Sequence, residues 1–477
     1  MTPVAPQKSK QTNEVGLIPD IALLIEARVK AGERNVQMKV VSNLILHDPV
    51  LTIEFLSYAN SVMYGGAAVA DVESAITRLG IKRVIALLSE LNGQAPTAPV
   101  EVREVIEILR YNCRRYSIVT LILAGVLNPS LVVAARASGL FADIGHMLAA
   151  MQLGTKYCEA AKANKRNTLP FRLQKDHNFD VNQALVRYLK AKSVPRLLIM
   201  PYDLDEKAKP GAETDLRLLV QAARELIESY DSGKWETYNP NRPLPAKSVL
   251  RMLSTLPFQQ QRIYQAVQEY LKLAAAEEAP EGASLLISAA DGDEIQPLNE
   301  AADLNIETLV VPRYPNLSVS PKSRDALKDF FELCEGTPDE MTLSAKSVDS
   351  LKKSGIFARA AILRVSADGK SIAVENAAGL GVGPGETIAL PPEQSPFGLL
   401  RVQVRSAQIS NEAAPAPFGT TAFGLGPLED MPTGDRRALY VDCSNAEAFK
   451  LESRRVFRLV LGLLAQSLQS ARNGPAK

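Results

Sequence analysis

Apolar residues recur with a helical period from Ile18 to about Ala276. Clear examples are the segments Val105–Val126, Asp215–Ser229 and Leu250–Leu273. Pro257 is expected to kink or divide the last of these, since proline lacks the backbone N–H of a helix interior. The pattern predicts a long, entirely helical part before any strand.

Within this part, residues 48–80 show where two helices begin and end. Asp48 can cap a helix that has Pro49 in its first turn and that Asn60-Ser61 closes. Asp71 can cap a second helix, which Gly80 ends in the left-handed conformation. A third helix is predicted from Ile81 to Asn92-Gly93.

The pattern changes in the carboxy-terminal part. Glu277–Ser284 is a polar break typical of a domain boundary, and no convincing strand precedes residue 283. Ser320-Pro321 begins another helix. The predicted strands are Leu285–Ile287, Thr308–Val311, Ile356–Val365, Ile372–Glu375, Gly398–Val404 and Ala438–Val441, with a hairpin turn at Ala367–Lys370 and a final amphipathic helix at Ala446–Ser470.

The helical segment around residues 48–80 resembles the HDOD domain, a family of helical output domains related to HD phosphohydrolases. The resemblance rests on several short elements in the family's order. They are Asp48-Pro49 with Leu51, then Ala59-Asn60-Ser61 with Tyr64, then Ser74-Ala75-Ile76 with Leu79-Gly80. It implies an all-α domain that serves signalling, in which Asn60 and Ser61 are expected at helix ends and in the core rather than in a binding site.

The carboxy-terminal part resembles a divergent GAF domain, a sensory α/β module. The resemblance rests on the hairpin that ends at Gly379, the turn Pro396–Leu400, the strand Ala438–Asp442 and the last helix. The expected fold class is therefore multidomain, with an all-α domain followed by an α+β domain that has an antiparallel sheet. The expected boundaries are a disordered tail at 1–16, an HDOD-like domain with a helical extension at 17–276, a linker at 277–319 and a GAF-like domain at 320–472.

Composition narrows the classes of function. The chain has 477 residues, of which 46% are hydrophobic, and its 54 basic and 53 acidic residues give a net charge of +1. This balance argues against binding nucleic acid through clustered cations. The sequence contains no run of about 18 apolar residues, so no membrane span is expected. The first sixteen residues are polar and lack the apolar core of a signal peptide. Four scattered cysteines without a C-x-x-C pair fit a reduced cytoplasm and exclude a zinc knuckle; they are expected to be buried.

The resemblance also indicates where phosphohydrolase chemistry would lie. HD phosphohydrolases hold metal with histidines and aspartates that acidify a water molecule. The corresponding segment here is GLFADIG, residues 139–145, in which Asp143 remains but Ala142 stands in place of the histidine ligand. A methyl group cannot coordinate metal. Asp143 is therefore expected to be a buried or capping carboxylate, and no metal or other cofactor is expected.

The chain has only three histidines. His47 is expected at the surface or beside the cap, His146 follows the degenerate segment, and His177 is placed before a helix. A structural or surface role is favoured over metal ligation for each of them.

Other motifs offer weaker hypotheses. Gly379, Gly381 and Gly383 lie in a glycine-rich stretch that no helix follows, so a loop is favoured over a phosphate site, although it could border a ligand pocket. Arg110, Arg114 and Arg115, close to Tyr111 and Tyr116, suggest either a nucleotide contact or a solvated helix face, and the latter is favoured. On the last helix Arg454, Arg455 and Arg458 are expected to face solvent.

These observations predict a non-enzymatic, cytoplasmic bacterial signalling protein. The HDOD-like part would bind other signalling proteins. The GAF-like part would bind a small molecule or cyclic nucleotide, or mediate homodimerisation. A residual metal-dependent phosphohydrolase and a nucleic-acid-binding regulator are the alternatives.

Overall fold

Side-chain caps start the two helices of the segment 48–80 where the sequence places them. Helix α3 (Pro49–Ala59) follows Asp48, and α4 (Val72–Leu79) follows Asp71. In both, the capping carboxylate accepts a hydrogen bond at 2.7 Å from the backbone N–H three residues along. Gly80 has φ +75°, which confirms the predicted left-handed end of α4.

A computed structural model provides the structure of the protein. It describes residues 16–33, 35–61, 67–93, 98–233, 257–277, 305–306, 309–310, 319–337, 339–390, 418–420, 423–443 and 451–473. The sequence predictions that lie outside these residues concern most of the tail, Tyr64, the boundary after Glu277, the strands Leu285–Ile287 and Gly398–Val404, the turn Pro396–Leu400 and the start of the last helix at Ala446.

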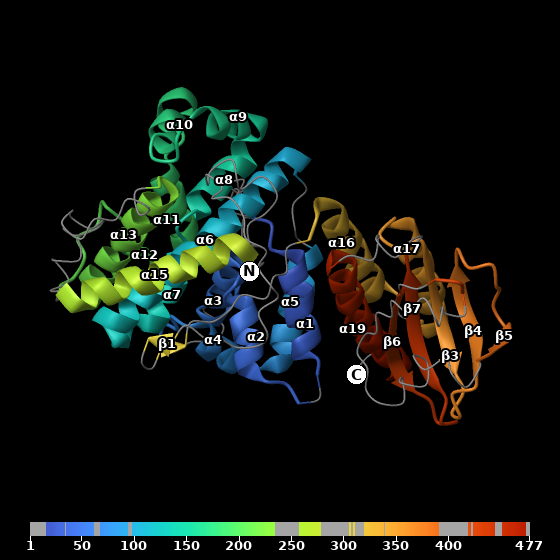
Figure 1. The fold of residues 1–477 in the computed structure, drawn as a ribbon. Coiled ribbons are helices and arrows are strands. Elements are labelled where there is room, and N and C mark those ends of the chain that lie inside the picture. The colour runs from blue at the N-terminus through green and yellow to red at the C-terminus, as the bar shows by residue number, and fades with distance from the viewer. Residues whose placement is uncertain are drawn as a thin grey trace, which may run out of the picture. The chain divides into compact units, whose positions relative to one another are not determined.

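Residue contacts divide the chain into two units, and these do not follow sequence order. Unit 1 comprises residues 1–19, 46–78 and 95–314, and unit 2 comprises residues 20–45, 79–94 and 315–477. Three early helices therefore group with the carboxy-terminal sheet. They are α1 (Ile21–Ala31), α2 (Met38–Ile45) and α5 (Ile81–Gly93); Figure 1 labels each of them.

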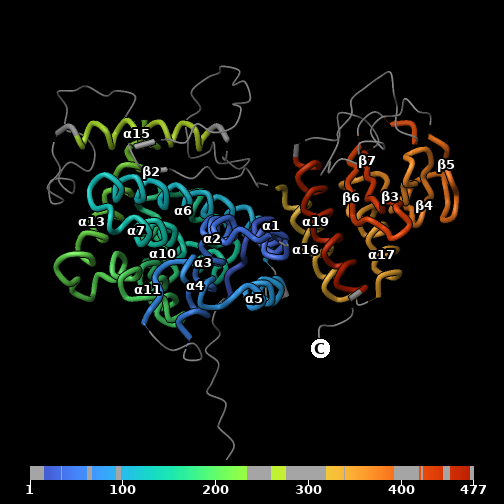
Figure 2. Tube along the Cα trace, turned by 90° about the horizontal axis from the view of Figure 1, so that it is seen from below, coloured from blue at the N-terminus to red at the C-terminus, as the bar shows by residue number. Residues whose placement is uncertain are grey.

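The long helix α6 (Val100–Leu127) organises unit 1. Helices α7, α13 and α15 pack against it, and α15 lies along it in Figure 2. Gly139 allows the close approach of α7, because a Cβ atom there would lie 2.7 Å from the Tyr116 carbonyl oxygen. The other elements of unit 1 are η1 (Pro129–Leu131), α7 (Val132–Leu140), α8 (Ile144–Leu153), α9 (Thr155–Ala163), α10 (Leu169–His177), α11 (Val181–Ala191), α12 (Arg196–Ile199), α13 (Ala212–Asp231), α15 (Pro257–Glu277) and the strand pair β1 (Asn305–Ile306) and β2 (Leu309–Val310).

A segment of unit 1, Pro129–Leu153, is long and apolar enough to cross a membrane by length and composition alone, with a mean hydropathy of 1.3. However, 83% of the 18-residue window that has this mean hydropathy is buried inside the protein. It includes α7 and α8, which pack on α6. Burial of this kind is typical of the core helices of a globular fold.

Unit 2 contains a five-stranded antiparallel sheet in the order β5-β4-β3-β7-β6. The predicted strands in the segments 356–365, 372–375 and 438–441 are confirmed as β3, β4 and β7. Pattern reading missed β6, whose FGLGPLED sequence has two glycines and a proline and shifts register at Pro427/Glu429. The elements are α16 (Pro321–Gly336), α17 (Glu340–Lys353), β3 (Arg359–Val365), β4 (Ser371–Ala378), β5 (Thr387–Ala389), β6 (Phe423–Asp430), β7 (Arg436–Asp442) and α19 (Leu451–Asn473).

Helices α17 and α19 pack against the sheet, and α16 and α1 pack on α19. A Cβ at Gly424 of β6 would lie 2.9 Å from the Phe457 ring, which places that side of the sheet against α19. The apolar stripe of α19 is buried within the unit, as predicted. The prediction for its arginines is wrong at Arg455, which is buried, whereas Arg454 and Arg458 are exposed. An α-helical part followed by an antiparallel sheet confirms the coarse fold class.

Candidate functional site

Asp143 lies in the turn between α7 and α8 and is 3% exposed. It occupies the N-cap position of α8, but its side chain makes no cap hydrogen bond. Instead, Arg166 Nη2 donates to both carboxylate oxygens, at 2.6 and 2.5 Å. Arg166 comes from the connection between α9 and α10, so this ion pair joins two parts of the chain. Asp143 was expected to be either a buried or a capping carboxylate; it is buried and its side chain does not cap α8.

The glycine that ends the GLFADIG segment has a packing role. A Cβ at Gly145 would lie 2.2 Å from the Val181 carbonyl oxygen. Helix α8 therefore contacts α11 through its backbone, and Asp143 is held at the start of that contact. In this segment, Gly145 therefore serves the packing of α8 on α11.

The surroundings keep Arg166 charged. Burial by itself would lower the pKa of its guanidinium, but Asp143 and Tyr116 raise it above its ordinary value. The guanidinium also lies 5.2 Å from the centroid of the Tyr116 ring, a cation–π contact. Burial raises the pKa of the nearby Cys113 thiol well above its usual range, and Asp143 adds to this effect. Asp143 therefore has a permanent cationic partner, and the thiol stays protonated.

The three histidines lie on different elements. His146, on α8, hydrogen-bonds through Nδ1 to the Tyr157 hydroxyl at 3.1 Å, and burial lowers its pKa to about 4. His47 is buried next to the N-cap residue Asp48, so of the two expected positions the one beside the cap is confirmed and the surface one is wrong. The His47 carbonyl accepts from Arg114 Nε at 3.1 Å. His177 is the last residue of α10 and precedes α11, so the expected position before a helix is confirmed. Within the described residues, no three His, Cys, Asp or Glu side chains gather closely enough to hold a metal ion.

The arginine cluster on α6 is buried, and the predicted solvated face is wrong. Arg110, Arg114 and Arg115 are all less than a tenth exposed. Arg110 Nε lies 2.8 Å from Asp48 Oδ2, and Arg115 Nη1 donates to Asp231 at 3.0 Å. The helical period of the sequence shows which face of α6 the arginines share. It does not show whether carboxylates from other elements pack over that face. These cations hold α6 to the starts and ends of neighbouring helices and are not displayed to a phosphate backbone.

The signature residues are mostly structural. Asn60 Nδ2 donates to the carbonyls of Leu56 and Val69, both at 2.9 Å, and its Oδ1 accepts from the Val69 N–H at 2.8 Å. Asn60 therefore fastens the end of α3 to the chain that follows. Asp48, Pro49, Ala75, Ile76 and Leu79 are buried, Ser61 and Gly80 are half-buried, and Ser74 is exposed.

The glycine-rich stretch of unit 2 connects two strands, β4 and β5. Gly379 has φ +81°, and a Cβ there would lie 2.8 Å from the Ala358 carbonyl oxygen. The Gly383 N–H donates to Glu386 Oε1 at 2.7 Å, and Gly381 has open space where a side chain would be. A strand rather than a helix follows, so the geometry is that of a sheet connection.

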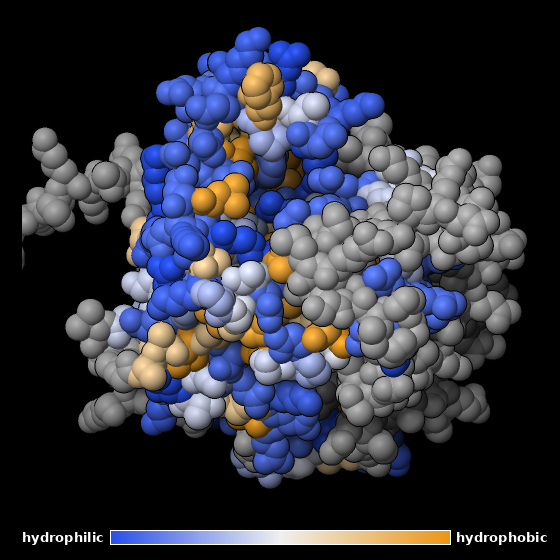
Figure 3. Space-filling view, turned by 90° about the vertical axis from the view of Figure 1, so that its left-hand side faces the viewer, coloured by the Kyte–Doolittle hydropathy of each residue, from blue (hydrophilic) through white to orange (hydrophobic). Residues whose placement is uncertain are grey.

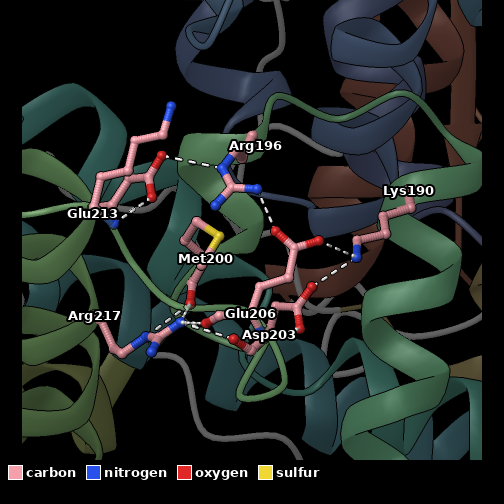
Figure 4. A network of polar contacts seen from close by, with 8 residues as sticks. Lys190, Arg196, Met200, Asp203, Glu206, Glu213 and Arg217 are labelled. Carbon is pink, nitrogen blue, oxygen red and sulfur yellow. Dashed lines mark hydrogen bonds and ion pairs between the residues drawn. The ribbon is translucent and has the colours of Figure 1, made fainter.

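A charged network braces the turn between α11 and α13 (Figure 4). Lys190 lies 2.7 Å from Asp203 and 3.0 Å from Glu206, and Arg217 donates to three backbone carbonyls of the turn. Hydrogen bonds from Lys190 and the charge of Arg196 hold the pKa of Glu206 below its usual value. Each carboxylate drawn there has a cationic or N–H partner, so the network stabilises a turn and leaves little charge for a ligand.

The side of unit 1 shown in Figure 3 is mostly hydrophilic over its described residues. Hydrophobic side chains are scattered among the hydrophilic ones rather than gathered in one broad area. Scattered exposed hydrophobic residues, such as Phe171 and Leu204, are normal on a protein surface.

Comparisons with known proteins agree with this picture of the helical part. Residues 16–192 match the family model of the HDOD domain. No curated protein matches the sequence.

Several solved structures match the chain at low identity and low TM-score. The MmoQ response regulator from Methylococcus capsulatus str. Bath is 18% identical with a TM-score of 0.42, over 53% of this chain and 99% of that one. A virulence factor from Campylobacter jejuni is 18% identical with a TM-score of 0.37, over 44% and 79%. An HDOD domain protein of unknown function from Geobacter sulfurreducens is 16% identical with a TM-score of 0.30, over 58% and 95%.

Proposed function

Because residues 16–192 form an HDOD domain, we propose that this chain is a non-enzymatic bacterial signal-transduction protein. Its HDOD domain serves as a scaffold for other signalling proteins. Its carboxy-terminal part, residues 320–472, is a GAF-like sensory or dimerisation domain.

The state of Asp143 supports the non-enzymatic part of this proposal. A catalytic HD centre needs imidazole and carboxylate ligands free to bind metal. Here Ala142 supplies no ligand, and both oxygens of Asp143 accept from Arg166. Binding a metal ion at Asp143 would take this buried carboxylate away from Arg166, its partly buried cationic partner, which is costly.

The sheet supports the GAF-like assignment. A central hairpin, β3 and β4, pairs through β3 with a late strand, β7, that precedes the last helix. Helices before and after the sheet, α17 and α19, pack against it. This arrangement fits the resemblance noted in the sequence.

The enzymatic alternative is tested on the full chain with Mg²⁺, Mn²⁺ or Fe²⁺, using cyclic dinucleotides and nucleoside phosphates as substrates. We expect no metal-dependent turnover and no stoichiometric metal by elemental analysis. Turnover that Asp143→Asn abolishes, while the exposed control Asp176→Asn retains it, would overturn the proposal.

The scaffold role is tested by a pulldown with the full chain at physiological salt, followed by reconstitution with the purified candidate. Direct, saturable binding to a signalling protein is expected. Salt-sensitive retention on DNA or RNA, without such a protein partner, would favour the nucleic-acid-binding alternative instead.

A further inference from the structure

A cavity of about 640 Å³ lies in unit 1 between α6, α8, α9 and the start of α10. This volume is within the usual range of small-molecule sites. The cavity adjoins the Asp143–Arg166 pair, since Arg166 is one of its lining residues.

One wall of the cavity is apolar. Val105, Ile108 and Leu109 lie at helical spacing on α6, so they present one continuous surface. Ala161 on α9 and Leu169 on α10 continue this surface on the other side. An acyl chain can fill such a wall by van der Waals contact and release of water, whereas a sugar or nucleobase needs several polar partners there.

Hydrogen-bond donors gather at the polar part of the cavity. Asn112 is 5% exposed, and its Nδ2 has no hydrogen-bond partner among the described residues. Arg166 uses only Nη2 for Asp143, so within the described part of the chain Nε–H and Nη1–H are not engaged. His146 is neutral at physiological pH, since burial lowers its pKa to about 4. A carboxylate in the cavity can accept charge-assisted hydrogen bonds from Arg166 and a hydrogen bond from Asn112.

The rim of the cavity is cationic. Lys162 and Lys165 line it beside Arg166, and its lining contains no carboxylate. Asp143 offsets part of the charge of Arg166. The site therefore suits a single negative charge attached to an apolar body.

We propose that this cavity binds a long-chain fatty acid, with the acyl chain against α6 and the carboxylate at Arg166, Asn112 and the lysine rim. The role of the bound acid as an effector rests on the proposed regulatory function. Binding itself does not depend on that function.

The test uses the full-length, delipidated chain and the fluorescent fatty acid cis-parinaric acid, displaced by palmitate. We expect saturable binding at one site, and methyl palmitate should compete at least about tenfold more weakly because it lacks the charge. Ala161→Phe fills the cavity and should weaken binding at least about tenfold. Ala160→Phe, on the same helix but outside the lining, is the matched control and should leave the affinity within about twofold.

A second pair of variants tests the rim. Lys162→Glu with Lys165→Glu should weaken fatty-acid binding about tenfold, whereas Lys156→Glu with Lys175→Glu makes the same change in net charge away from the cavity and should not. Circular dichroism checks that each variant is folded.

The proposal is wrong if the folded chain does not bind the probe, if methyl palmitate competes as well as palmitate, or if both alanine variants behave alike. Displacement by AMP but not by palmitate would assign the cavity to a different ligand class. These readouts involve no catalysis and no partner, so they remain interpretable even if hydrolase activity overturns the proposed function.

Discussion

The ion pair between Asp48 and Arg110 makes a specific energetic prediction. Both side chains are almost completely buried, and Arg110 Nε lies 2.8 Å from Asp48 Oδ2. The other oxygen of Asp48 caps α3. Arg110 also pairs with Glu107 and donates to the Ile18 carbonyl, so the loss of Asp48 leaves it with some partners.

Asp48→Ala removes the cap, which costs about 1 kcal/mol, and breaks a buried pair, which costs about 3–5 kcal/mol. Because Glu107 remains, we expect the lower end of the second range, for a total of about 4 kcal/mol. Asp48→Asn retains a capping oxygen and should cost about 3 kcal/mol. Asp71→Ala removes a cap without such an ion pair and should cost about 1 kcal/mol.

A double-mutant cycle separates the pair from its surroundings. Arg110→Met leaves Asp48 buried without its cation, and combining it with Asp48→Asn removes both charges. We expect the double variant to be more stable than the sum of the single effects by about 2 kcal/mol. If the change in the free energy of unfolding of the double variant equals the sum of the two single changes within about 0.5 kcal/mol, the reasoning is refuted.

The assay is hydrogen–deuterium exchange of peptides from α3 and α6, which reports the free energy of local opening. Exchange is preferable to a single denaturation curve because a chain of two units is not expected to unfold in one step. The Asp71→Ala control should change exchange in α4 but leave α6 protected.

Three further predictions follow from close contacts and burial. Gly145→Ala should destabilise the α8–α11 contact by about 2 kcal/mol or more, since the new Cβ would lie 2.2 Å from the Val181 carbonyl oxygen; Gly336→Ala, which meets open space, is its control, and equal melting temperatures would contradict the packing argument. Burial lowers the pKa of His146 from 6.5 to about 4. The contribution of neutral His146 to the free energy of unfolding is therefore fully present above pH 6.5, and it is lost by about 1.4 kcal/mol per pH unit as the pH falls towards 4. His146→Gln should flatten this part of the stability–pH curve, and an unchanged slope would contradict the prediction. Gly462→Val should loosen α1 from α19, because a Cβ at Gly462 would lie 2.8 Å from Val29; faster exchange in α1 is expected, and unchanged protection would show that Val29 can move aside.

Local signals predicted the helix ends well. The caps at Asp48 and Asp71 and the left-handed Gly80 depend on residues within one turn of the chain, so the sequence contains the whole cause. The hairpin of β3 and β4 was predictable for the same reason. Strand β6 was not, because its glycines and proline hide the alternation and its pairing with β7 comes from distant residues.

In the candidate site, too, local features were predictable from the sequence and contacts between distant residues were not. The four cysteines are buried, as expected from the sequence. The partner of Asp143 was not predictable, since Arg166 lies 23 residues away in a connection without a motif. The cavity was missed because its wall combines side chains from four separate elements.

The sequence alone determined where helices start and end, because caps and left-handed glycines act on residues within one turn of the chain. Only the tertiary structure decided whether a charge is solvated or buried. Arg110, Arg114 and Arg115 looked like a solvated face, yet carboxylates and carbonyls from other parts of unit 1 surround them. Whether an arginine is displayed or enclosed depends on which distant groups fold over it, and the local pattern contains no record of those groups.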